Sequence, residues 1–227
     1  MQRRSALRVI SAFRTVSEGA ALVLASTPPI DLLIHEKQEI YKELRKYEEC
    51  RLCNKKRAAI KKSARQRLLD NWQKRWDSDT AGRWTHHLIP RVDTWLNRTH
   101  GQVNYYLTQA LTGHGCFNAY LKRFHKTDSA KCAHCGHYPD DVTHTIFECT
   151  ASAKSRKSLN ETLGGIDIKV KNIISTMLDK ENAWTAISAY VTRTMQEKRR
   201  LEEAERMAKS QPTPVPTETL APEPQTP

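Results

Sequence analysis

A short cysteine-rich segment in the second half of the chain contains four residues of the types that bind zinc. The candidate ligands are Cys132, Cys135, His144 and Cys149, in the pattern C-x2-C-x8-H-x4-C. Zn2+ prefers four thiolate or imidazole ligands in a tetrahedron. The C-x2-C turn presents two thiolates to one ion, and Gly136 lets the chain curl tightly behind the second. Four protein ligands leave no open position for water or substrate, so the pattern predicts one structural Zn2+ ion and no zinc chemistry.

Two other histidines compete for the third ligand position. His134 lies between the first two cysteines and would strain the turn, and His137 follows Cys135 too closely for an easy return. The cysteines could also be unliganded buried thiols. Disulfides are disfavoured because no signal-peptide core indicates an oxidising compartment.

Two cysteines upstream, Cys50 and Cys53, form another C-x2-C pair. A lone pair without a second half is weak evidence for a metal site. Inside a helix the two residues would be i,i+3 neighbours, so we interpret them as small apolar residues on one face. Cys116 is isolated, and we expect it to be packed.

The elements around this loop are predicted to be mainly α-helical. We expect one or two helices over residues 3–25, a break at Thr27-Pro28-Pro29, and a helix from about 32 to 76, with or without a break, that Asp31 caps. Short helices follow a loop in 77–100, and 101–125 is predicted to be helical. Two further helices are expected at about 166–179 and 182–209. Trp184, Ile187, Val191 and Met195 share one face of the last helix, which then becomes mostly charged and should project beyond the core.

The predicted organisation has four parts. Residues 1–76 form N-terminal helices, 77–160 a tryptophan-containing linker with the cysteine loop, and 161–209 the C-terminal helices. Residues 210–227 hold six of the ten prolines and no aromatic residue, so we predict a disordered tail.

The helix predicted to end near 76 carries a strongly basic block. Between Arg51 and Arg75 there are ten Lys or Arg residues and one acid, Asp70, in a chain whose net charge is +12. A solvated helix face normally mixes charges of both signs, so the block predicts contact with nucleic-acid phosphates, although an ordinary solvated face stays possible. The residues that we expect to make these contacts are Arg51, Lys55, Lys56, Arg57, Lys61, Lys62, Arg65 and Arg67.

An aromatic stripe at helical spacing precedes the cysteine loop. It consists of Phe117, Tyr120, Leu121 and Phe124. Such a stripe is typical of a core and less often a platform for stacked bases. Trp84 and Tyr138 are further candidates for stacking on unpaired bases.

The sequence contains no phosphate-binding glycine loop, no nucleophile elbow and no H-E-x-x-H. Tyr138-Pro139-Asp140-Asp141 matches the Y-x-D-D of reverse transcriptases superficially. That motif belongs at a hairpin between apolar strands with another carboxylate upstream, whereas here it lies between predicted zinc ligands. We therefore predict no catalytic centre.

Several of these segments, taken together, resemble the C-terminal region of non-LTR retrotransposon reverse transcriptases, most closely the R1-like clade of arthropods. The matching stretches, which cover roughly residues 2–160, are ALRVISAFRTVS (6–17), TPPIDLL (27–33), GRWT through WLNR (82–98), LTGHGCFNAYLKRF (111–124) and the cysteine loop through 149. The resemblance implies the end of a polymerase thumb or its linker, followed by a CCHC zinc knuckle that holds template RNA or target DNA. The x8 spacing exceeds the x4 of the retroviral nucleocapsid knuckle, so that binding mode is not carried over.

Fingers, palm and endonuclease of that family are not in this sequence, so we expect a truncated element, a fragmentary gene model or a remnant. The leading hypothesis is a module that binds RNA or DNA largely through its backbone, in the nucleus or the cytoplasm, without a membrane or a small-molecule substrate. The alternatives are a part of an RNA-directed DNA polymerase that is active only in the full-length polyprotein, and a structural remnant. An arginine-rich mitochondrial transit peptide over residues 1–25 is a further, disfavoured reading of the N-terminus.

Overall fold

The computed structural model describes residues 1–47 and 53–210, and within these ranges it contains helices and loops but no β-strand. The prediction of a mainly α fold is confirmed. Cys50, Arg51 and the predicted tail after residue 210 lie outside the described residues. No helix in the described part of the chain has the length and apolar character that crossing a membrane requires.

The N-terminal segment forms two short helices, α1 (Gln2–Val9) and α2 (Glu18–Leu24). Ser17 caps α2, because its Oγ accepts a hydrogen bond from the backbone N–H of Ala20 at 3.3 Å. The five residues from Ala20 to Leu24 are all buried, so α2 lies inside the body and is not an exposed amphipathic helix.

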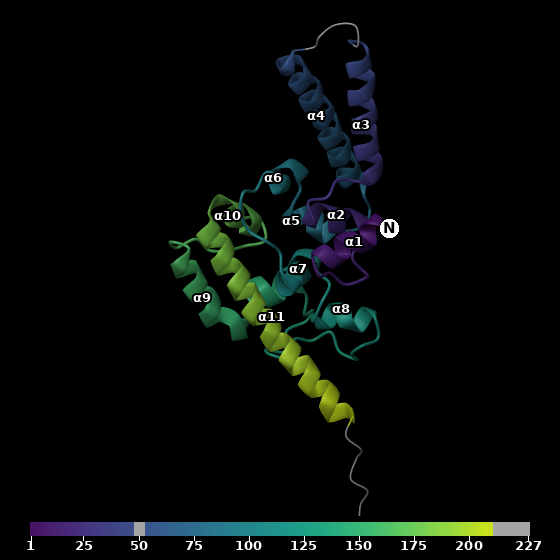
Figure 1. Cartoon of the computed structure of the whole chain (residues 1–227). Helices are drawn as coiled ribbons and strands as arrows, with labels where there is room; N and C mark the ends of the chain where they lie inside the picture. The colour runs from purple at the N-terminus through teal and green to yellow at the C-terminus, as the bar shows by residue number, and fades with distance from the viewer. Residues whose placement is uncertain (48–52, 211–227) are drawn as a thin grey trace, which may run out of the picture.

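The next two helices form a hairpin that projects from the body (Figure 1). They are α3 (Ile30–Arg45) and α4 (Asn54–Ser78), so the segment predicted from 32 to 76 is two helices that pack against each other. The expected cap is wrong: α3 begins after Pro29, and Asp31 sits in its first turn, where it pairs with Arg75 of α4. Trp72 and Trp76, one helical turn apart, are buried at the base of the hairpin and anchor it.

Four short helices follow: α5 (Arg83–Leu88), α6 (Val92–Leu96), α7 (Tyr105–Thr112) and α8 (Asn118–Arg123). The helix expected over 101–125 is therefore interrupted. Gly113 ends α7 with a φ of +72°, a left-handed conformation that glycine adopts without steric cost.

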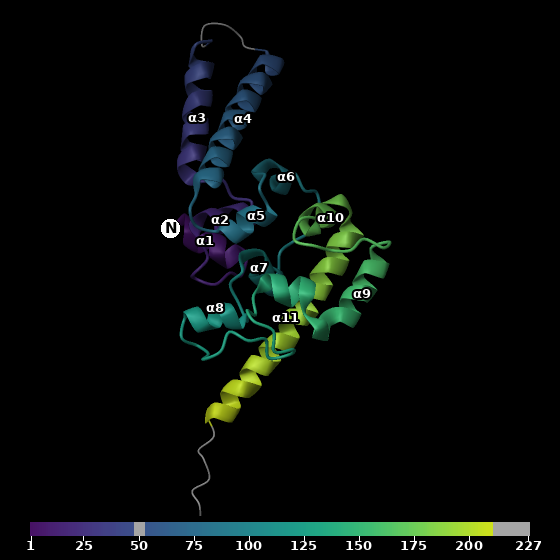
Figure 2. The same cartoon turned by 180° about the vertical axis from the view of Figure 1, so that it is seen from behind.

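Three helices complete the fold: α9 (Ala153–Thr162), α10 (Ile173–Asp179) and α11 (Glu181–Ser210). Helix α9 was not predicted, and the helix expected at 166–179 begins only at Ile173. The predicted apolar face of α11 is confirmed, since Trp184, Ile187, Val191 and Met195 are all buried. The end of α11 projects beyond the body on the side opposite the hairpin (Figures 1 and 2).

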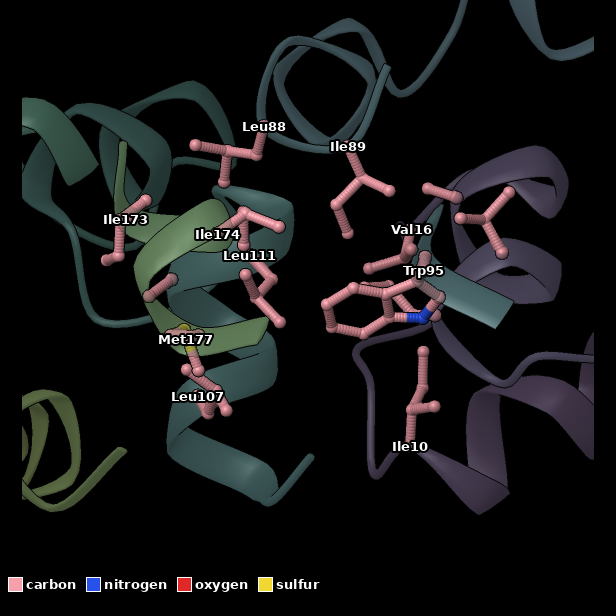
Figure 3. Close-up of a cluster of buried hydrophobic side chains, with 14 of the residues drawn as sticks. Ile10, Val16, Leu88, Ile89, Trp95, Leu107, Leu111, Ile173, Ile174 and Met177 are labelled. Atoms are coloured by element: carbon pink, nitrogen blue, oxygen red, sulfur yellow. The ribbon is translucent and has the colours of Figure 1, made fainter. Parts of the chain in front are cut away.

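One hydrophobic core joins the N-terminal helices to α11 (Figure 3). Trp95 of α6 is fully buried and lies near Ile10 and Val16 of the N-terminal segment, and its ring centroid is 5.7 Å from that of Trp184 in α11. Trp95 thus packs between the N-terminal segment and α11. Removing its side chain would open a cavity that borders both segments.

Candidate functional site

The four predicted zinc ligands come together in the structure. The Cys135 Sγ lies 3.2 Å from Nε2 of His144 and 3.7 Å from the Cys149 Sγ, and the Cys132 and Cys149 sulfurs are 4.0 Å apart. All four ligand atoms lie within 4.8 Å of one another. Metal–sulfur bonds of about 2.3 Å in a tetrahedron place the sulfurs about 3.8 Å apart, so the four atoms can hold one metal ion of the size of Zn2+.

Local backbone geometry brings the first two cysteines together. The N–H of Cys132 donates to the carbonyl of His137, and the N–H of Gly136 donates to the carbonyl of Cys132, each at 2.8 Å. Gly136 has a φ of +76°, which a residue with a side chain rarely adopts. The tight turn predicted behind Cys135 is therefore present.

The other two ligands flank a π-helical turn, His144–Glu148. Asp141 caps this turn, because its Oδ1 accepts the N–H of His144 at 2.8 Å. The N–H of Cys149 donates to the carbonyl of His144 at 2.7 Å. Single π-turns are rare and frequently occur at functional sites. Here the turn places the His144 ring and the Cys149 sulfur on the same side.

His137 stacks on His144 at 4.3 Å between ring centroids and, with Glu148, forms a second group that could hold a metal. Both groups need His144, so they are alternatives to each other. The first group offers three sulfurs, which zinc prefers, whereas the second has none and its other two members are exposed. His134 is half-buried and belongs to neither group.

The pKa values of the candidate metal ligands depend on their surroundings, and a bound cation would change them. Burial raises the pKa of the Cys132 thiol to about 12, whereas the backbone N–H of His137 lowers the pKa of Cys135. Burial also lowers the pKa of His144, which keeps its imidazole neutral, the form that binds metals. A metal ion bound here would supply the positive charge that turns a buried thiol such as Cys132 into a thiolate.

A buried ion pair fixes the loop to α11. Asp140 is fully buried and accepts two hydrogen bonds, each of 2.7 Å, from the Nζ of Lys198, itself only 5% exposed at the side chain. Asp140 also accepts from the Thr145 hydroxyl at 3.0 Å and from the backbone N–H of Asn118 at 3.0 Å. Tyr190 of α11 adds a 2.8 Å hydrogen bond to the carbonyl of Ile146. Asp140 therefore connects the loop, α8 and α11.

The basic helix α4 is partly neutralised by α3. Arg65 pairs with Glu36 at 2.9 Å, Arg67 with Glu39 at 3.0 Å, and Arg75 with Asp31. These contacts lie between the base of the hairpin and the middle of α4. Arg65 and Arg67, which we predicted to contact phosphates, already have carboxylate partners in the free protein.

The outer half of α4 differs. Lys55, Arg57, Lys61 and Lys62 are exposed and form no ion pair with any described residue. The neighbouring Lys56 lies over the ring of Tyr47 with its Nζ 4.0 Å from the centroid. These exposed cations of α4 thus lie in the half of the helix that points away from the body (Figure 1).

The predicted aromatic stripe divides between core and surface. Phe117 is buried, Tyr120 is half-buried, and Phe124 is 37% exposed. Of the two other stacking candidates, Trp84 is half-buried with its Nε1 donating to the Ala110 carbonyl at 2.8 Å, and Tyr138 is 64% exposed. The sequence did not predict that Thr15 joins this cluster. Its hydroxyl hydrogen-bonds to the Tyr120 hydroxyl and to the His114 ring, and it lies 105 residues from Tyr120 along the chain.

No family model and no solved structure matches the chain. A Pol polyprotein of the type-1 retrotransposable element R1 4 from Nasonia vitripennis is 28% identical over 90% of this chain and 53% of its own length. A putative 115 kDa protein of the R1DM element from Drosophila melanogaster is 33% identical over 68% of this chain and 16% of its own length.

A third relative, the Pol polyprotein of an R1 element from Bradysia coprophila, is 33% identical over 55% of this chain and 12% of its own length. The chain thus spans about half, or much less, of the relatives it matches. The resemblance inferred from the sequence motifs is confirmed: the chain is a homologue of one region of the Pol polyproteins of R1 retrotransposable elements.

Proposed function

We propose that the chain is a nucleic-acid-binding module of an R1-type Pol protein, which grips the RNA or DNA backbone with the outer half of α4 and holds one structural Zn2+ ion. Single-stranded RNA is the preferred ligand. The observation that carries the proposal is the distribution of ion pairs along α4. Acids of α3 pair with Arg65, Arg67 and Arg75, whereas the outer half carries exposed cations that form no ion pair with a described residue.

Electrostatics explain why such a division favours a polyanion. Lysines that repel one another cost stability unless an anion relieves the repulsion. The hairpin projects from the body (Figure 2), and the exposed residues Lys55, Arg57, Lys61 and Lys62 lie in the outer half of α4. Phosphate contacts of this kind position a chain on nucleic acid without reading its sequence. Two relatives are named as retrovirus-related Pol polyproteins, which supports a role in nucleic-acid binding.

The zinc ion is proposed to be structural and not catalytic. Three thiolates and one imidazole would complete its coordination and leave no position for a substrate. The chain is likewise proposed to have no polymerase centre of its own. Both carboxylate oxygens of Asp140 accept from Lys198, and one oxygen of Asp141 accepts the N–H of His144, so both carboxylates already have partners within the protein. If the chain were itself an active RNA-directed DNA polymerase, it would incorporate nucleotides on a template, and Asp140→Ala would abolish that incorporation.

A salt titration of RNA binding tests the hairpin. The observed affinity should fall steeply with salt, and the log–log slope counts the phosphates that are neutralised. Replacing Lys55, Lys56, Lys61 and Lys62 with Gln should lower that slope by about 3 units, since each lost contact removes roughly 0.7–0.9. Glutamine keeps a helix propensity close to that of lysine, so α4 should persist.

The matched control removes the same number of positive charges from another surface. Lys154, Lys157, Lys171 and Lys180 are exposed on or beside α9 and α10, and their replacement by Gln changes the net charge equally. The control variant should retain most of the slope. Any loss of affinity in either variant should be about equal for RNA strands of unrelated sequence. Equal slopes for the wild type and the α4 variant would show that the hairpin is only a solvated surface.

A further inference from the structure

A hollow of about 350 Å³ lies between the aromatic stripe and the cysteine loop. Its walls include Trp84, His114, Tyr120 and Arg123, together with the segment from Asp141 to Thr143. This volume falls at the lower end of the roughly 300–1,000 Å³ of small-ligand sites, which is enough for one nucleotide. The hollow is distinct from the metal ligands and from the tip of the hairpin.

Hydrogen bonds hold the aromatic rings of this hollow in place. The Thr15 hydroxyl bonds to the Tyr120 hydroxyl at 2.7 Å and to Nδ1 of His114 at 2.9 Å, and the two rings lie 5.0 Å apart. Burial, with the nearby charge of Arg123, lowers the pKa of His114 to about 4, so its ring is uncharged at neutral pH. Rings fixed before binding lose little entropy when a planar ligand stacks on them.

The polar groups of the hollow suit a nucleotide better than an apolar ligand. Arg123 is exposed, and its guanidinium can bind a phosphate in two parallel hydrogen bonds. Asp141 supplies a carboxylate that can accept N–H groups of a base, while its Oδ1 already accepts the N–H of His144. One cation and one hydrogen-bond acceptor beside aromatic rings are what a base with its phosphate requires.

The cysteine loop supplies one wall of the hollow. Residues 141–143 directly precede the ligand His144, and Asp140 ties them to Lys198. Gly113 also lines the hollow, in the left-handed conformation that ends α7. The metal site therefore shapes the hollow even though its ligands do not line it.

We infer that this hollow binds one unpaired base of a single-stranded RNA, with Tyr120 as the stacking surface and Arg123 on the adjacent phosphate. The inference rests on the proposed function and deepens it, since it adds a base-dependent contact to the phosphate contacts of α4. It assigns to the cysteine loop the role of building a wall and not of touching the base through Tyr138.

The test compares two RNA strands of equal length and charge. One is an ordinary unstructured 12-mer and the other has every base replaced by hydrogen, and fluorescence anisotropy gives the affinity of the zinc-loaded protein for each. At a salt concentration that suppresses phosphate contacts, the wild type should prefer the strand with bases by at least about fivefold, the lower end of one stacking contact. Tyr120→Leu should bring the ratio close to one, and Tyr120→Phe should keep it.

Two more variants make the outcome decisive. Ala119 also lines the hollow, so Ala119→Leu should obstruct it and abolish the preference while Tyr120 is retained, and the test does not depend on the folding of one variant. Tyr138→Leu changes the exposed tyrosine outside the hollow and should keep it. Zinc content and the unfolding midpoint verify each variant.

Equal affinity of the wild type for both strands would overturn the inference while leaving backbone binding by α4 intact. A preference that is lost in Tyr138→Leu but kept in Tyr120→Leu and Ala119→Leu would also overturn it and would place the base on the loop. Failure of both strands to bind even at low salt would instead refute the proposed function, and the inference with it.

Discussion

The cysteine loop and the α3–α4 hairpin use the same type of ion pair in opposite ways. In the loop, Asp140 and Lys198 are both nearly inaccessible to water, with side-chain exposures of 0% and 5%. In the hairpin, Arg67 and Glu39 are 48% and 40% exposed. A buried pair determines how segments fit together, because either charge alone would be intolerable there. An exposed pair mainly sets where charge remains available to a partner.

This difference shows where the function of each region can reside. Asp140 and Ile146 of the loop hydrogen-bond to α8 and α11, so these polar groups are used within the protein. The buried residues of α4, from Ala64 to Trp76, lie toward the body, and its outer half carries cations that form no ion pair with a described residue. The first region is suited to stability and shape, and the second to contact with a polyanion.

The largest effect is expected at the metal ligands. Cys149→Ser or Cys132→Ser should remove the bound zinc completely, whereas Cys53→Ser and Cys50→Ser should retain one zinc per chain, as measured by metal analysis. Chelation should increase hydrogen exchange in residues 125–150 more than in α1 and α2, because metal binding is coupled to local folding. Release of zinc by the Cys53 change would show that the ligands are assigned wrongly.

A second, smaller loss is expected from the buried ion pair. Asp140→Asn should lower the free energy of unfolding by about 3–5 kcal/mol, because it leaves the Lys198 charge buried without its counter-ion. Denaturant unfolding measures this value. Asp140→Asn combined with Lys198→Met should recover much of the loss, since no unpaired charge then remains. A double variant that is as unstable as both single variants together would contradict this explanation.

The smallest effect is expected from the exposed pair of the hairpin. Arg67→Gln should change the free energy of unfolding by no more than about 1 kcal/mol, and the change should shrink as salt screens the pair with Glu39. Comparing this variant with Asp140→Asn in the same denaturant series isolates burial as the variable. A loss at Arg67 that equals the loss at Asp140 would remove the distinction between the two regions.

The spacing of the metal ligands was sufficient to predict that Cys132, Cys135, His144 and Cys149 come together, because short loops limit how far these residues can separate. The partner of Asp140 could not be predicted, since Lys198 is 58 residues away in a highly charged stretch of α11. The face of α11 was predictable from its four regularly spaced apolar residues. Helix α9 buries only Leu159 and therefore carries almost no periodic signal.

The charge of α4 illustrates the same limit. Its basic composition is visible in the sequence, but which cations are neutralised depends on the register against α3, and that register is a tertiary property. Asp31 was expected to cap a helix and instead pairs with Arg75, which a local rule cannot foresee. The candidate residues for phosphate contact are therefore those of the outer half of α4 and no longer the whole basic block.

Lysine reactivity in the presence of RNA tests the assignment of the binding surface most directly. The zinc-loaded protein is acetylated at low extent with and without single-stranded RNA, and mass spectrometry gives the protection of each lysine. Lys55, Lys61 and Lys62 should be strongly protected, while Lys154, Lys157 and Lys171 should react equally in both samples. Unchanged reactivity along α4, together with protection of the lysines near α9, would contradict the proposal that the hairpin holds the nucleic acid.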